Sequence, residues 1–167
     1  VIVFDKKIID ICDEVPTNCE IIDAKGNYVC SGLIDIHIHG CKGFDAMDED
    51  ENAVEIISKG LAETGVTSFL PTTMTMSPER IYKAFDNIIK AKNKSIKGAK
   101  VLGAHMEGPF ISPAKKGAQA AENIMHCDYE YFSRLQKAAN GLIKLVDIAP
   151  EEPGAMEFID RAKGEVV

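Results

Sequence analysis

The sequence predicts an α/β fold built around a parallel sheet. Three observations favour this fold. Short apolar stretches with the period of strands alternate with amphipathic stretches with the period of helices, the connections between them are short, and polar side chains gather where the strand-like stretches end. Such alternation is typical of parallel strands with helices packed outside them. Two architectures satisfy these observations, an open doubly wound sheet and a closed (β/α)8 barrel.

Residues 1–30 form the first part of the chain. Short apolar stretches separated by turn residues predict a small β element, which is too small to bury a core by itself. Its predicted strands cover residues 1–4, 8–12, 20–23 and 28–30.

The following stretch, residues 31–40, predicts a strand with two different faces. Because side chains alternate along a strand, three isoleucines lie on one face and Asp35, His37 and His39 lie on the other. Gly40 ends this strand and leaves room for a group to approach the backbone closely.

After residue 40 the apolar period changes to that of a helix and then alternates between helix and strand. Ser77 followed by Pro78 predicts one helix start and Asp128 predicts another, while Gly65 and Gly141 predict helix ends. These signals predict helices over residues 51–64, from 77, over 128–140 and over 153–163, and strands over 66–73, 100–107, 142–149 and from 165.

The polar face of the 31–40 strand favours the barrel, because a face that reads Asp-x-His-x-His suits a barrel wall better than the centre of a sheet. No glycine-rich phosphate loop follows this strand, which argues against a nucleotide-binding sheet. Roughly four βα units are present, whereas a closed barrel needs eight and typically ~250 residues. The sequence therefore predicts the first half of a (β/α)8 TIM-type barrel over residues 31–167, preceded by a separate small β domain over residues 1–30.

The two histidines of the 31–40 strand are the first candidate for chemistry. His37 and His39 can both lean toward one point at the end of the strand, and neutral imidazole is a common ligand of zinc and iron. The alternative is a half-buried strand whose polar face happens to carry histidine, and so short a motif does not decide between the two.

A second polar pair, His105 and Glu107, shares one face of the strand at 100–107. A glutamate there could instead pair with a lysine or arginine, or lie in solvent. Parallel strands bring their ends to the same level, so the two clusters favour a metal site formed by His37, His39 and Glu107. For His105, support of a metal ligand from behind and a satisfied position in the core both stay open.

Composition excludes several classes of function. The chain carries 26 acidic and 19 basic residues and a net charge of -7, which argues against nucleic acid as its main partner. No apolar run approaches the ~20 residues that cross a bilayer, and no signal-peptide pattern is visible. The five cysteines include no Cys-x-x-Cys pair and are odd in number, which favours free thiols in a reducing, cytoplasmic compartment.

Three motifs carry a resemblance to a known family. Residues 32–40 resemble the first-strand signature of the amidohydrolase superfamily, and residues 65–72 resemble its second-strand segment. The segment 105–111, followed by Lys-Lys-Gly-Ala at 115–118, is similar to the deacetylases of N-acetylglucosamine 6-phosphate within this superfamily. The resemblance covers nearly the whole chain.

The resemblance implies a metal-dependent barrel with a small β-sandwich built from both chain ends. It implies hydrolysis of the acetyl group of N-acetylglucosamine 6-phosphate to glucosamine 6-phosphate and acetate, with one or two divalent ions, zinc or iron, in a homodimeric full-length protein. It assigns His37, His39 and Glu107 as metal ligands. It also assigns the backbone of Ala118 to sugar contact, with Gln119 beside it as a weaker candidate.

The resemblance also implies what this chain lacks. The general acid/base aspartate and two further histidine ligands belong to strands beyond Val167, so we expect no catalytic residue and no activity in residues 1–167 alone. Asp35 is expected to support the structure or a ligand, and Asp147 is not assigned to catalysis. The lysines at 115 and 116 are expected to be solvated rather than to bind phosphate.

Two rival functions stay open from the sequence. One is another amidohydrolase, dihydroorotase-like or acting on N-acyl amino acids. The other is a sugar-phosphate-binding module without metal or catalysis.

Overall fold

The computed structural model describes residues 1–167, which form two compact units, Val1–Gly32 and Leu33–Val167. In the first unit, strands β1 (Ile2–Phe4) and β2 (Lys7–Asp10) pair as an antiparallel hairpin. Residues 24–27 form a turn, closed by a hydrogen bond of 2.9 Å from the Asn27 amide to the Ala24 carbonyl. The strands predicted at 20–23 and 28–30 are not formed. Neither stretch has a neighbouring strand with which to pair, and an isolated strand has no stability of its own.

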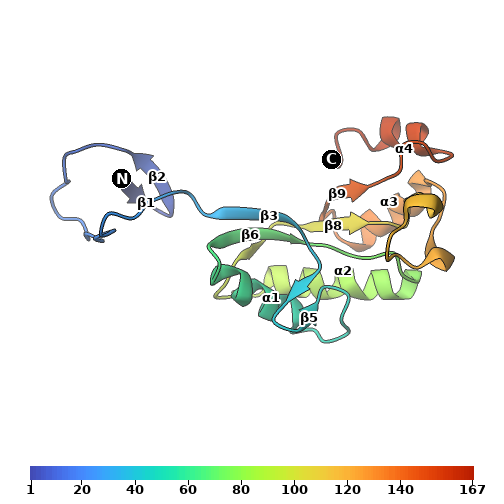
Figure 1. Ribbon diagram of the computed structural model, residues 1–167, viewed down its shortest axis with the longest axis horizontal. Helices are drawn as coiled ribbons and strands as arrows, with labels where there is room; N and C mark the ends of the chain where they lie inside the picture. Colours follow the sequence, from blue (N-terminus) through green and yellow to red (C-terminus); the bar gives the residue numbers. More distant parts are fainter. The chain divides into compact units, whose positions relative to one another are not determined.

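The second unit is built on parallel strands that follow one another in chain order (Figure 1). Strand β3 pairs with β6, β6 with β7, and β8 with β9, all in parallel. A parallel bridge between Thr72 and His105 links β6 to β8. The predicted parallel α/β fold is confirmed. The strands are β3 (Leu33–Ile38), β6 (Val66–Pro71), β7 (Lys100–Val101), β8 (Ala104–Glu107) and β9 (Ile143–Asp147).

Helices α1, α2 and α3 connect these strands, and α4 follows β9. Helices α1 and α2 lie together along one side of β3, β6 and β8 (Figure 1). The two predicted helix starts are confirmed. Pro78 opens α2, and Asp128 accepts a hydrogen bond of 3.0 Å from the Tyr131 amide. Helix α1 ends earlier than predicted, with Glu63 as its C-cap, and Gly65 lies in the left-handed turn that follows. The helices are α1 (Ala53–Ala62), α2 (Pro78–Asn93), α3 (Tyr129–Ala138) and α4 (Ala155–Ala162).

The core lies between the strands and these helices. The apolar stripe of α2 is fully buried, and it packs with aromatic side chains from β6, α3 and the loop after β8. The largest of these buried side chains are Phe69, Ile81, Phe85, Ile88, Phe110 and Phe132. This apolar packing anchors the strands whose ends carry the candidate site.

Two stretches differ from the prediction. The strand predicted over 100–107 is divided into β7 and β8 at Gly103, where an added Cβ would lie 2.4 Å from the Leu142 carbonyl oxygen. The chain therefore leaves β6 and comes close to the segment before β9 at this glycine.

A short antiparallel hairpin, β4 (Gly40–Cys41) with β5 (Phe44–Asp45), was not predicted. Lys42 and Gly43 form its turn with positive φ angles of 56° and 82°. The space at Gly40 is filled by this hairpin, since an added Cβ would lie 2.0 Å from the Phe44 carbonyl oxygen.

The strand predicted from residue 165 is met only at Val167, since residues 164 and 165 form a turn and Val166 bridges to Lys163. Val167 accepts a hydrogen bond of 2.9 Å from the Val146 amide and donates one of 3.1 Å to the Lys144 carbonyl, so it pairs with β9. None of the helices is both long and apolar enough to cross a membrane.

Candidate metal centre

Strand β3 and the residue that follows it place His37 and His39 on one face of the parallel strands. Thr72, just after β6, holds the residue between them. The Ile38 amide donates to Thr72 Oγ1 at 2.9 Å, and the Thr72 amide donates to the Ile38 carbonyl at 2.9 Å. The two imidazoles are therefore carried on backbone that is clamped to the neighbouring strand.

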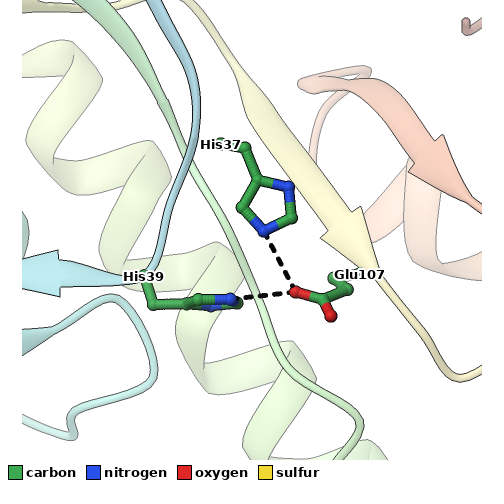
Figure 2. A group of neighbouring side chains, drawn as sticks. All are labelled: His37, His39 and Glu107. Atoms are coloured by element: carbon green, nitrogen blue, oxygen red, sulfur yellow. Dashed lines mark ion pairs between the residues drawn. The ribbon is translucent and has the colours of Figure 1, made fainter. Parts of the chain in front are cut away.

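Glu107 comes from the end of β8 and meets both histidines, as the sequence predicted from parallel strand ends (Figure 2). Its Oε2 atom lies 2.9 Å from His39 Nε2 and 3.2 Å from His37 Nε2. The two rings stand nearly perpendicular to each other. Three potential ligand atoms from distant parts of the chain thus converge on one point.

The hydrogen bonds around this point provide no positive charge to balance the Glu107 carboxylate. His39 Nδ1 lies 3.2 Å from the Thr72 carbonyl oxygen. A carbonyl only accepts, so Nδ1 carries the proton in the neutral ring and Nε2 presents a lone pair. Glu107 Oε2 is buried and has no hydrogen-bond donor. Facing lone pairs of imidazole and carboxylate suit a divalent cation, so these residues fit a metal ion.

The other oxygen of Glu107 is bonded to the protein. Gln119 donates from Nε2 to Glu107 Oε1 at 2.8 Å, and its own Oε1 accepts a hydrogen bond of 2.8 Å from the Thr75 amide. Ala118, the other predicted sugar contact, is exposed on the same loop and lies outside the cluster of charged groups.

A second group of three lies behind His37. His105 Nε2 is 3.0 Å from Asp147 Oδ2, and His37 Nδ1 is 4.0 Å from the same oxygen. His105 is 2% exposed, and its Nδ1 lies 2.9 Å from the Ile36 carbonyl oxygen. Its ring also meets the edge of the His37 ring, with centroids 4.6 Å apart. The structure therefore places His105 directly behind a candidate ligand.

The sequence did not predict that Asp147 belongs to this second group. Its position at a strand end was visible, but its pairing depends on β8 and β9 lying side by side. Asp35 is not part of either group. It accepts a hydrogen bond of 3.0 Å from the His37 amide, which steadies the backbone of that histidine.

Two other side chains near the site, Lys116 and Cys41, form hydrogen bonds within the protein. Lys116 donates to the Gln119 carbonyl at 3.0 Å and so closes its own loop, while Lys115 is exposed. Cys41 donates to the Ile57 carbonyl at 3.6 Å, and burial raises the pKa of its thiol, which disfavours the thiolate that a metal would need. All five cysteines are free thiols, as predicted.

Comparison with known proteins agrees with this arrangement. The N-acetylglucosamine-6-phosphate deacetylase of Bacillus subtilis (strain 168) is 43% identical over 155 residues, covering 91% of this chain and 39% of the relative. The N-acetylgalactosamine-6-phosphate deacetylase of Escherichia coli O157:H7 is 31% identical over 152 residues, covering 91% of this chain and 40% of the relative. The chain thus spans about two fifths of the length of these curated relatives.

Solved structures show the same fold. The crystal structure of N-acetylglucosamine-6-phosphate deacetylase from Pasteurella multocida superposes with a TM-score of 0.75 at 31% identity, over 89% of this chain and 40% of that one. The model of the amidohydrolase family, whose members generally depend on metal, matches residues 28–162. This match spans both candidate groups of ligands, and the chain belongs to the amidohydrolase family.

Proposed function

We propose that this chain is the N-terminal part of a metal-dependent deacetylase that hydrolyses N-acetylglucosamine 6-phosphate to glucosamine 6-phosphate and acetate. The observation that carries the proposal is the convergence of His37, His39 and Glu107 on one point. The names of the relatives, and above all the 43% identity to the Bacillus subtilis deacetylase, support the substrate.

The strand order supports a (β/α)8 barrel as the complete fold. In an open doubly wound sheet the strand order reverses at a switch point, whereas barrel strands follow the chain. Here β3, β6, β7 with β8, and β9 are neighbours in chain order, and Val167 continues the series beside β9. We assign residues 31–167 to the first four βα units and residues 1–30 to part of a small β-sandwich.

His37, His39 and Glu107 would hold the metal through two imidazole nitrogens and one carboxylate oxygen. A divalent ion at this point, zinc or iron, supplies Lewis-acid activation of the amide carbonyl and of water. Hydrolysis of an amide at neutral pH needs such help, because the amide is a poor electrophile and water a poor nucleophile.

The chain's own residues hold this site in shape. The Thr72 carbonyl keeps the proton of His39 on Nδ1, so Nε2 stays free to bind. Asp35 steadies the His37 amide, and the backbone of Ala118 is placed to meet the sugar on an exposed loop. Transfer of a proton to the leaving amine is assigned to an aspartate of the part of the protein beyond Val167.

A second substrate is favoured by one observation. The Escherichia coli relative acts, by its name, on N-acetylgalactosamine 6-phosphate and is 31% identical. The two sugars differ only in the configuration at C4, so a metal site that acts at the acetyl group does not by itself distinguish them, and the choice between them depends on contacts to the sugar ring.

The test is a product assay on the full-length protein with its metal content measured in parallel. We expect acetate release from N-acetylglucosamine 6-phosphate at a higher kcat/KM than from the galactosamine epimer, and loss of release after metal removal by a chelator. A higher kcat/KM for the epimer would make N-acetylgalactosamine 6-phosphate the assigned substrate. A protein that binds no zinc or iron, even on reconstitution, would overturn the hydrolase and favour a sugar-phosphate-binding module.

A further inference from the structure

We propose that Gln119 is a positioning residue that sets the orientation of the Glu107 carboxylate for metal binding. The inference rests on the proposed function, since it requires a metal at Glu107. It assigns Gln119 to the metal centre rather than to the sugar.

Both ends of the Gln119 amide are already bonded within the protein. The residue is 6% exposed, its Oε1 accepts from the Thr75 amide at 2.8 Å, and its Nε2 donates to Glu107 Oε1 at 2.8 Å. A backbone amide only donates and a carboxylate only accepts, so the partners permit one orientation of the Gln119 amide. One N–H and one lone pair of the amide remain, but with the residue 6% exposed they offer little surface to a sugar hydroxyl.

The bond to Gln119 makes the two oxygens of Glu107 unequal. Oε1 is occupied by the amide of Gln119, while Oε2 is buried, has no donor and lies 2.9 Å from His39 Nε2 and 3.2 Å from His37 Nε2. The carboxylate is thus held with a free lone pair toward the histidines before any ion binds. Such preorganisation reduces the entropy lost on binding.

Gln119 itself is fixed from two sides. Its backbone amide donates to the Lys116 carbonyl at 3.0 Å, and Lys116 Nζ donates to the Gln119 carbonyl at 3.0 Å. Thr75 belongs to the segment between β6 and α2, so Gln119 ties this segment and its own loop to the end of β8.

The experiment measures metal affinity by competition with a chelator in full-length Gln119→Glu and Gln119→Met. Gln119→Glu keeps the oxygen that accepts from Thr75 but loses the donor to Glu107. Gln119→Met keeps the approximate size and loses both bonds. We expect metal affinity to fall about 10- to 100-fold in both variants, the range for residues that orient metal ligands. KM for the sugar phosphate in the metal-saturated enzyme should not change.

Gln136→Glu is the matched control. Gln136 also binds a strand through both ends of its amide, donating to the Ile143 carbonyl and accepting from the Ile143 amide, each at 3.0 Å. It touches none of the candidate ligands, so its variant should retain the metal affinity of the unaltered protein even if it loses thermal stability.

Unchanged metal affinity in the Gln119 variants would overturn the inference, and a raised KM with unchanged affinity would return Gln119 to the sugar. Gln119→Glu decides the question if the methionine variant does not fold, because it retains the size and the Thr75 bond. Failure of the unaltered protein to bind metal would instead overturn the proposed function.

Discussion

His105 and Asp147 join the ends of two neighbouring strands through a contact of 3.0 Å between His105 Nε2 and Asp147 Oδ2. The other nitrogen of His105 lies 2.9 Å from the carbonyl of Ile36, the residue before His37. The pair therefore connects β9, β8 and β3 directly behind a candidate metal ligand.

Replacing Asp147 by asparagine should weaken metal binding by about tenfold or more, the lower end of the range for residues that orient metal ligands. The change keeps the size of the side chain but removes the charge that lies 4.0 Å from His37 Nδ1. A chelator-competition titration measures it. Asp160→Asn, on the exposed face of α4, is the control and should leave the affinity unchanged. Equal affinities for both variants would limit Asp147 to a structural role.

The double variant His37→Ala with His39→Ala should lower the number of metal ions bound per chain, because both Nε2 atoms face Glu107 Oε2. Elemental analysis of purified full-length protein gives this number. His126→Ala serves as the control, since this histidine is exposed and belongs to neither group of potential ligands. Unchanged metal content in the double variant would assign both histidines to support of the structure.

Glu107→Gln should lower kcat/KM by more than ~100-fold while the fold is retained, because partners of ligands alone are worth about 10- to 100-fold. The glutamine keeps the shape and can still accept the hydrogen bond from Gln119. Steady-state kinetics and circular dichroism measure the two effects. The control is Glu122→Gln. Glu122 is exposed in the segment that follows β8, so this variant is expected to behave as the unaltered protein. Near-normal turnover of Glu107→Gln would place the metal elsewhere.

Gly40→Ala should reduce both stability and metal affinity. The added methyl group would lie 2.0 Å from the Phe44 carbonyl oxygen, and overpacking of this kind costs about 1–3 kcal/mol. The displaced hairpin also holds His39, whose carbonyl accepts a hydrogen bond of 2.7 Å from the Ala46 amide. Thermal unfolding and metal titration give the two quantities.

Gly141→Ala is the control for this variant. Gly141 has a φ of 72° with open space around it, so alanine there costs about 1–2 kcal/mol of strain without moving a ligand. Equal loss of metal affinity in both variants would show that general destabilisation, rather than displacement of His39, is the cause.

The candidate ligands could be predicted from the sequence because their signals are local. The alternation that places His37 and His39 on one face, and the position of Glu107 at a strand end, depend only on the period of two and on the parallel order of strands. The helix starts at Pro78 and Asp128 are local in the same sense.

The contacts that complete the site could not be predicted, because each joins segments far apart in the chain. Gln119 reaches the Thr75 amide across 44 residues, and His105 reaches the Ile36 carbonyl across 69. The space at Gly40 was assigned to an approaching group because glycine signals a close contact without naming the partner. That partner is the backbone of the β4–β5 hairpin.

Residues 1–167 by themselves are expected to release no acetate from N-acetylglucosamine 6-phosphate. The chain supplies three candidate ligands, but neither nearby aspartate is available to move a proton. Asp35 accepts a hydrogen bond from the His37 amide, and Asp147 Oδ2 lies 3.0 Å from His105 Nε2. The His37 side chain is 45% exposed, so water has free access to the site.

The exposed apolar face of β3 leads to the same expectation. Ile34 and Ile36 are 61% and 54% exposed, although a parallel strand of this kind is normally covered on both faces. In the proposed barrel the second half of the protein covers this face and supplies the acid/base aspartate. The test compares the isolated 167-residue chain, its mass verified by mass spectrometry, with the full-length protein in one acetate-release assay. Release by the isolated chain at a rate near that of the full-length protein would refute the half-barrel assignment, because no residue beyond Val167 would then be required for catalysis.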